Sequence, residues 1–497
     1  MKIKKLLSVL ITLSFLSAVL FSCTATNDNN PNSPDSQADL NNSDDSGNAE
    51  EATDDSLYTD DLPEFNFNGE KFKMLTFPER PDTYTSFIYE EQTGDIVEDS
   101  VYLANRTVEA RFNIEFEQML TSDWNDMPNY VKKNVRADDY EYDFVNIGDR
   151  LAMNLAMEGK YFYTMSELTH VNLEKLYWDQ NLQKDMSVGN VLYFTYGSNM
   201  LSTYDYICLL IFNKQIASDL GLENMYNLVR EGKWTIDKMY QLGAEAVADL
   251  NGDGKMDKED RYGVLQAFNY YYPGFWAAER LPLIAKDEND LPYFNVPGNE
   301  KLFSIFNKLY DYAQTDIEFD TPGLYETGPF PMFIENKGLF ANATMYTLKH
   351  VRGMEVDYGI LPYPTLNEIS AGDPYSSRLC VATTVIVPVT AAPERASVIL
   401  EALACEYEKR VVPNYLNISV QVKGVRDDES IEMLQMMINN RFVDLGDTVW
   451  LDAGRANYER LFQQRSNTFQ SVTEKITAKV EKTLQTAIEA FQTADGQ

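Results

Sequence analysis

The residues best placed to do chemistry form a short acidic segment from Asp249 to Asp260. It reads Asp-Leu-Asn-Gly-Asp-Gly-Lys-Met-Asp-Lys-Glu-Asp. Oxygen-bearing side chains stand at positions 1, 3, 5, 9 and 12 of this segment and a glycine at position 6, which is the pattern of an EF-hand calcium loop. The segment therefore predicts one calcium ion in a structural role. A solvated acidic turn is the alternative interpretation.

The predicted calcium ligands are side-chain oxygens and one backbone carbonyl. They are Asp249, Asn251, Asp253, Lys255 through its carbonyl, Asp257 directly or through water, and Asp260. Gly254 would allow the sharp turn between them, and Asp260 stands where the standard loop has a glutamate, so the loop resembles the dockerin variety. A strand predicted at Tyr262 follows too soon for a second helix. We therefore expect a clamp on a loop, not a calcium switch.

A second group of candidates follows a short apolar strand. The run Tyr142-Asp-Phe-Val-Asn-Ile-Gly ends at Asp149 and Arg150. In open α/β sheets ligands bind beyond the carboxyl ends of the strands, so both side chains are candidates for binding a polar ligand. A surface ion pair is the alternative.

Strands alternate with helices along most of the chain. Residues 72–77 and 262–268 have the composition of strands, and residues 101–112 have helical spacing with Val101, Ala104 and Val108 on one face. Further strands are predicted at residues 338–343 and 358–364. This alternation predicts an α/β fold with mixed, mostly parallel sheets.

The N-terminus has the features of an export signal. A charged start is followed by an apolar run that ends in Ser22-Cys23, so residues 1–22 are predicted to be a signal peptide. The pattern resembles a bacterial lipobox, in which Cys23 is acylated; secretory cleavage near Ser22 with an incidental cysteine is the alternative. Residues 23–64 are rich in Asn, Asp, Ser and Ala, which is typical of a disordered acidic tether. We expect a lipid anchor, palmitate included, at the extracellular face of a bacterial cell membrane.

Length and composition limit the domain organisation and the function of the part of the chain that follows the tether. About 430 residues follow the tether, more than one hydrophobic core normally supports, so two lobes are expected. The net charge of −35 argues against nucleic acid as a partner. Two histidines in 497 residues leave little material for histidine catalysis, and no Gly-x-Ser-x-Gly motif occurs.

Several short motifs, taken in order, resemble one family of proteins. They are the Phe212-Asn-Lys turn, Gly232-Lys-Trp-Thr-Ile-Asp, Lys337-Gly-Leu-Phe-Ala, Tyr358-Gly-Ile-Leu-Pro-Tyr-Pro and the segment Val381 to Glu394. Together they resemble the family 1 extracellular solute-binding proteins of ABC sugar importers, the maltose-binding-protein-like group. The resemblance covers roughly residues 65–410.

The resemblance implies a two-lobed periplasmic-binding-protein-like fold of type II with a hinge. By analogy residues 65–205 and 380–497 form lobe 1, and residues 206–379, with the loop 249–260, form lobe 2. Packing of part of the C-terminal helices on lobe 2 is the alternative. It further implies a solute-binding protein without enzymatic activity. Its partners would be a small polar ligand, a carbohydrate above all, and the permease subunits of an ABC importer, with the lipid anchor as the contact to the membrane.

Aromatic residues supply most of the remaining candidates for ligand binding. Tyr270, Tyr271, Tyr272 and Trp276 stand after the strand at Tyr262, where the resemblance places a stacking tyrosine. Pro273 breaks this run, so not all of them can belong to the core, and we expect one or two to contact ligand and the rest to pack. Analogy alone adds the last candidates, which are Tyr204, Asp205, Tyr206, Tyr346 and Tyr375.

Two other functions stay open at this point. A secreted surface glycosidase needs two carboxyl groups about 5 to 9.5 Å apart, and a chain with 77 acidic residues does not exclude such a pair. A ligand sensor on the same fold is the other alternative, since fold does not fix function.

Overall fold

We describe the protein from a computed structural model that places residues 58–77, 87–121, 123–321, 328–422 and 427–495. The predicted signal peptide, Cys23 and the tether up to residue 57 lie outside the described residues. In the part of the chain that is described, no helix combines the length and apolarity needed to cross a membrane.

The first lobe is built on a four-stranded sheet with the strand order β12-β3-β1-β2. Its strands are β1 (Glu70–Thr76), β2 (Ile114–Leu120), β3 (Phe144–Gly148) and β12 (Thr383–Ile386). β1 pairs in parallel with both β2 and β3, and β12 closes the sheet antiparallel to β3. β3 is buried along its whole length, as expected for a central strand covered on both faces.

The first lobe also contains helices. They are α1 (Ile96–Phe112), α2 (Met127–Arg136), α3 (Asp149–Glu158), α4 (Gln180–Met186) and α12 (Pro393–Val422). α1 buries Val97, Val101, Ala104, Val108 and Phe112, the i, i+4 stripe of an amphipathic helix, and packs along α12. Its N-cap Asp95 accepts hydrogen bonds from two backbone N–H groups of the first turn.

The second lobe is built on a five-stranded sheet with the strand order β10-β4-β9-β5-β8. Its strands are β4 (Cys208–Asn213), β5 (Tyr262–Gln266), β8 (Glu318–Asp320), β9 (Gly338–Thr344) and β10 (Tyr358–Leu361). β5 is parallel to β8 and β9, whereas β4 is antiparallel to β9 and β10. The helices of this lobe are α6 (Lys214–Asp219), α7 (Met225–Arg230), α8 (Ile236–Ala246), α9 (Phe268–Ala278), α10 (Glu300–Ala313), α11 (Phe330–Ile334) and α13 (Asp428–Asn439).

Two passages of the chain connect the sheets side by side. The first leads from α5 (Ser202–Asp205) into β4, and the second leads from β11 (Ser377–Arg378) into β12. They meet in an antiparallel bridge between Ile207 and Leu379, and the backbone N–H of Cys380 donates to the carbonyl of Tyr206. Paired crossings of this kind are where a hinge between the lobes would bend.

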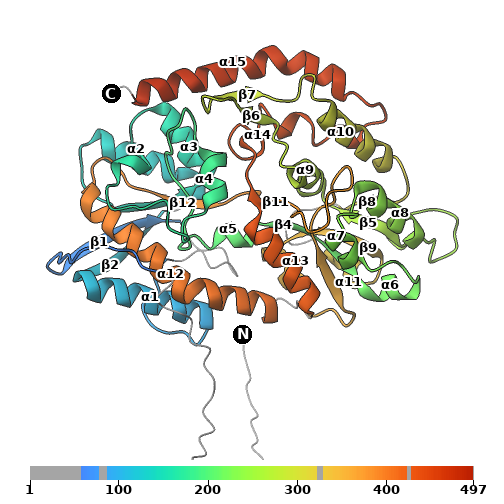
Figure 1. Ribbon diagram of the computed structural model, residues 1–497, viewed down its shortest axis with the longest axis horizontal. Helices are drawn as coiled ribbons and strands as arrows, with labels where there is room; N and C mark the ends of the chain where they lie inside the picture. Colours follow the sequence, from blue (N-terminus) through green and yellow to red (C-terminus); the bar gives the residue numbers. More distant parts are fainter. Residues whose placement is uncertain (1–57, 78–86, 122, 322–327, 423–426, 496–497) are drawn as a thin grey trace, which may run out of the picture. The chain divides into compact units, whose positions relative to one another are not determined.

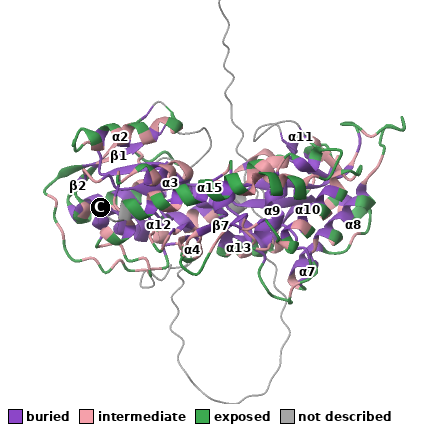
Figure 2. Cartoon of the chain, turned by 90° about the horizontal axis from the view of Figure 1, so that it is seen from above, coloured by how far each residue is buried: buried purple, intermediate pink, exposed green. Residues whose placement is uncertain are grey.

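The C-terminal segment contacts both lobes. After α13, which packs against β10, the chain forms β13 (Arg441–Phe442) beside β11 and then α14 (Leu445–Thr448) beside β6 (Ile284–Lys286), the partner of β7 (Pro292–Phe294). The final helix α15 (Phe469–Asp495) runs across the top of Figure 1 and contacts α10, β7 and α3. Figure 2 shows exposed residues along the outer faces of the helices, whereas the inner strands β3 and β4 are buried along their whole length.

Candidate functional site

A cavity of about 230 Å³ lies where the two sheets and the two crossings meet. It is lined from the first lobe, from the second crossing, from the second lobe and from the C-terminal segment. The lining residues are Phe77, Trp124, Arg150, Tyr206, Asn269, Tyr270, Arg378, Cys380, Val381, Ala382, Thr383 and Arg455. Polar groups from both lobes thus converge on one space, as in a binding site that closes around its ligand.

The wall from the first lobe is aromatic. Phe77 follows β1, and Trp124 begins a short 3₁₀-helix after β2; their rings meet edge to face with centroids 4.8 Å apart. Trp124 lies directly on the end of β3, where a Cβ at Gly148 would stand 2.1 Å from its ring. Only glycine at position 148 therefore lets the indole lie there, half-buried with part of its surface toward the cavity.

The wall from the second lobe comes from the first turn of α9. Asn269 and Tyr270 are partly exposed there, while the residues that follow are buried. Pro273 lies inside this helix and has no N–H to donate to the carbonyl four residues earlier, which belongs to Asn269. Arg455 donates to that carbonyl instead, at 3.3 Å, so the helix continues through the proline and ties α9 to the C-terminal segment.

A buried ion-pair cluster supports the cavity from behind. Asp447 of α14 binds Arg378 with both carboxylate oxygens, Nη2 lying 2.8 Å from Oδ1, and also pairs with Nε of Arg455. Burial alone would raise the pKa of Asp447, but the two guanidinium groups outweigh burial and hold this pKa below its usual value. One carboxylate thus fixes two arginines that both reach the cavity.

Arg150 is held differently from the other two arginines. It lies in the first turn of α3, and its Nε donates to the carbonyl of Thr448 at 2.6 Å. The neighbouring Asp149 is buried and accepts hydrogen bonds from the backbone N–H groups of Arg150 and Ala382 and from the hydroxyl of Tyr196. Burial raises the pKa of Asp149 to about 6. Asp149 therefore fixes the end of β3 against the second crossing and does not reach the ligand space.

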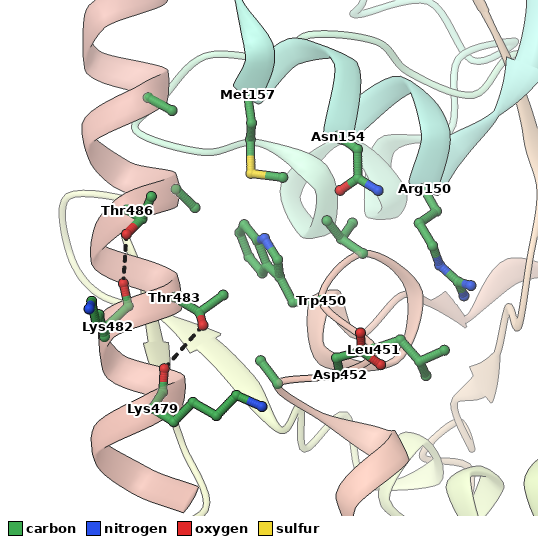
Figure 3. A pocket seen from close by; sticks show the side chains of 14 residues that line it. Arg150, Asn154, Met157, Trp450, Leu451, Asp452, Lys479, Lys482, Thr483 and Thr486 are labelled. Atoms are coloured by element: carbon green, nitrogen blue, oxygen red, sulfur yellow. Dashed lines mark hydrogen bonds between the residues drawn. The ribbon is translucent and has the colours of Figure 1, made fainter. Parts of the chain in front are cut away.

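A larger cavity of about 700 Å³ lies on the other side of Arg150, beneath α15. Figure 3 shows Asn154 and Met157 of α3 on one side of this space and the threonines of α15 on the other, with Trp450 between them and Arg150 at the edge. Its lining is mainly apolar and comes from α3, α15 and the segment 449–453. We take the smaller cavity as the candidate site because polar groups of both sheets converge on it at the ends of β1 and β3.

The structure places the sequence-predicted residues in two groups. Arg150 and Tyr206 line the cavity. Tyr346 lies next to it, with its ring 6.0 Å from that of Tyr206, but does not line it. Asp149 and Tyr375 are buried behind other residues; the hydroxyl of Tyr375 accepts from the backbone N–H of Trp234.

Tyr271, Tyr272 and Trp276 require a correction, because the structure buries all three in the core of the second lobe. The hydroxyl of Tyr271 bonds that of Tyr240, the ring of Tyr272 stacks on Phe462 at 3.9 Å, and Trp276 packs against Phe306. Side chains of a helix point in different directions around its axis, and in α9 the side chain of Tyr270 is the one of these aromatic residues that faces the cavity.

Tyr204 and Asp205 are likewise buried away from the cavity. The ring of Tyr204 lies 5.6 Å from that of Tyr415 and beneath the guanidinium of Arg441, and Asp205 accepts a hydrogen bond of 2.5 Å from the hydroxyl of Tyr415. Both side chains therefore hold α5 to α12. The predicted contact of Tyr204 and Asp205 with a ligand does not fit this placement.

Sequence reasoning missed most of the lining. Phe77 and Trp124 follow strands, so the same strand-end argument that selected Arg150 could have selected them. Arg378 and Arg455 carry no local signal, because only the folded chain brings β11, α14 and the turn after it together.

The predicted calcium loop keeps its turn geometry without converging on a point. Asp249 accepts from the backbone N–H groups of Gly252 and Gly254, and buried Asp260 accepts from those of Leu250 and Asp257. Gly254 has φ +77°, which the sharp turn requires. Across the described residues, no three His, Cys, Asp or Glu side chains are arranged to hold a metal ion.

Comparison with known proteins identifies the fold. Neither a scan of protein-family models nor a search of curated proteins finds a match to the sequence. Among solved structures, the sugar-binding protein MalE from Xanthomonas citri superposes with a TM-score of 0.57 at 13% identity, covering 85% of this chain and 99% of its own. The chain has the two-lobed fold of a solute-binding protein. The fold predicted from the sequence is confirmed.

Two further structures show the same fold. UspC of Mycobacterium tuberculosis matches with a TM-score of 0.56 at 12% identity, over 83% of this chain and 99% of its own. The ABC substrate-binding protein Lmo0181 from Listeria monocytogenes, solved in complex with cycloalternan, matches with a TM-score of 0.53 at 9% identity, over 84% of this chain and 99% of its own.

Proposed function

We propose that this protein binds a small carbohydrate in the cavity between its lobes and delivers it to an ABC importer. The observation that carries the proposal is the cavity itself, into which aromatic and polar side chains of both lobes project. Half-exposed rings such as Trp124 and Tyr270 offer flat apolar faces to the C–H side of a sugar ring. The fold, which is that of structures solved as sugar-binding proteins, supports the same conclusion.

Asn269 adds a polar requirement that a sugar meets. Its Oδ1 is buried at the cavity and has no hydrogen-bond partner among the described residues. A buried acceptor without a donor costs about 1 to 3 kcal/mol. A sugar hydroxyl donating to this oxygen would remove that cost on binding.

Binding without hydrolysis suits this lining better than a glycosidase. Glycoside hydrolysis uses two carboxyl groups that flank the scissile bond. The described residues that line the cavity include neither aspartate nor glutamate. A ligand held by both lobes instead favours the closed state and shifts the population toward it, which is what a transport partner would recognise.

The membrane anchor and the calcium ion are separate parts of the proposal. We propose that a lipid on Cys23 holds the protein at the outer face of the cell membrane, which Cys23→Ala should abolish in a fractionation experiment. The oxygen-rich loop 249–260 has the donor set that calcium prefers. The residues that would hold the ion, once their oxygens converge, are Asp249, Asn251, Asp253, Lys255, Asp257 and Asp260.

Calorimetry and thermal unfolding against a panel of mono- and oligosaccharides test the main proposal. A ligand present at 100 times its dissociation constant should add about 2.7 kcal/mol to the free energy of unfolding and raise the melting temperature. Unchanged melting temperatures across a broad panel of neutral and charged sugars, with correctly folded protein, would contradict carbohydrate binding.

A further inference from the structure

The cavity offers hydrogen-bond donors in excess of acceptors. Its charged lining residues are Arg150, Arg378 and Arg455, and the described lining includes no carboxylate. A guanidinium carries five N–H donors and no acceptor. A hydroxyl of a neutral sugar must both donate and accept, so a lining of this kind satisfies only half of its bonding capacity.

Two of the three arginines are already committed within the protein. Arg378 is bound by both oxygens of Asp447, and Arg455 pairs with Asp447 and Glu459 and donates to the carbonyl of Asn269. Their charges are largely compensated by these carboxylates, which lie behind the cavity wall.

Arg150 keeps donors available. Only its Nε is used, by the carbonyl of Thr448, and Nη1 and Nη2 have no hydrogen-bond partner among the described residues. The oxygens of the adjacent Asp149 accept hydrogen bonds from the backbone N–H groups of Arg150 and Ala382 and from the hydroxyl of Tyr196, and Asp149 accepts none from the guanidinium of Arg150. Two parallel N–H donors of one guanidinium are matched by the two oxygens of a carboxylate or phosphate.

We propose that the ligand is an acidic sugar, whose carboxylate or phosphate is bound by Nη1 and Nη2 of Arg150 while a ring hydroxyl donates to Oδ1 of Asn269. This inference rests on the carbohydrate-binding function proposed above and narrows it to one chemical class. Trp124 and Tyr270, on opposite walls, then hold the ring between them.

The test compares each acidic sugar with its neutral parent. Calorimetry on the full-length protein would measure glucuronate against glucose, galacturonate against galactose, and glucose 6-phosphate against glucose, with the corresponding disaccharides as a second set. We expect at least one acidic member to bind tenfold or more tightly than its parent, because a charge-assisted bidentate contact is worth more than neutral hydrogen bonds. The carboxylate and phosphate arms show which anion the site takes. Added salt should weaken binding of the acid and leave that of the parent unchanged.

Three variants decide whether Arg150 is responsible. Arg150→Gln should abolish the preference for the acid, Arg150→Lys should keep part of it, and Arg465→Gln, at an exposed position outside the cavity, should leave it unchanged. Circular dichroism and melting temperature check that each variant is folded. A neutral parent that binds as tightly as its acid, or an acid preference that survives in Arg150→Gln, would overturn the inference while leaving carbohydrate binding intact. Absence of binding by acids and parents alike would overturn the proposed function as well.

Discussion

Removing the charge of Asp447 should destabilise the protein more than other conservative substitutions of a single carboxylate. Asp447 and Arg378 are 2% and 3% exposed at their side chains, and Arg455 is 12% exposed. In the variant Asp447→Asn, the guanidinium groups of Arg378 and Arg455 would stay buried without the carboxylate that both of them pair with. Breaking a buried ion pair by removing one partner costs about 3 to 5 kcal/mol, mostly because the remaining charge is left uncompensated.

Chemical denaturation followed by circular dichroism measures this loss directly. Asp452→Asn is a matched control, because Asp452 is an exposed carboxylate five residues further along with no ion pair among the described residues, and its loss should be within about 0.5 kcal/mol. The substitution Asp447→Asn should also weaken ligand binding, since Arg378 and Arg455 line the cavity.

The pH dependence provides a second readout of the same carboxylate. The pKa of Asp447 is lower in the folded state than in the unfolded chain. Its contribution to the free energy of unfolding is therefore fully present above the unfolded pKa of about 3.9 and is lost as the pH falls through the folded pKa. Asp447→Asn should lose this part of the acid sensitivity. A destabilisation of less than about 1 kcal/mol at neutral pH would show that the cluster does not stabilise the fold as argued.

Three further predictions concern the ligand, the metal and the core. Trp124→Ala and Tyr270→Ala should each weaken sugar binding by about 1 to 3 kcal/mol in calorimetry, whereas Tyr293→Ala, at an exposed position on β7, should bind like the wild type. Millimolar calcium should raise the melting temperature of chelator-treated protein but not that of Asp253→Ala; equal responses of both would refute a site in this loop. Burial raises the pKa of Glu318 to about 7, so the free energy of unfolding should fall by at most about 3 kcal/mol as the pH rises from 4 to 7. Glu318→Gln should flatten this dependence in denaturation curves recorded across that range, and an unchanged slope would contradict the assignment.

The fold could be predicted because each strand of the two sheets has a strong local pattern. The strand expected at residues 72–77 is β1, the one at 262–268 contains β5, and the one at 338–343 lies within β9. Central strands covered on both faces are continuous apolar runs, and helices between them have a clear 3.6-residue period. Apolar runs and helical periods involve residues that are close in the sequence, so the sequence alone is sufficient to predict these strands and helices.

The candidate site could be predicted only where it depends on the end of a strand. The strand-end argument selects Arg150. The sequence does not separate Tyr270 from Tyr271 and Tyr272, because the choice depends on the rotation of α9 about its axis, and a proline at position 273 locally indicates a break in the run. The helix continues because Arg455, nearly 190 residues away, satisfies the carbonyl that the proline leaves open.

Net charge is a poor guide to the charge of a ligand in such a protein. The value of −35 argues against polyanions that must lie along a large surface, because many contacts add up there. A small ligand in a cavity depends mainly on the groups within contact distance, since solvent-exposed charges more than about 8 Å away are largely screened at physiological ionic strength. Those groups are three arginines, of which Arg150 retains open donors. An acidic chain can therefore select an acidic sugar, and the position of one guanidinium decides this more than the other carboxylates of the sequence.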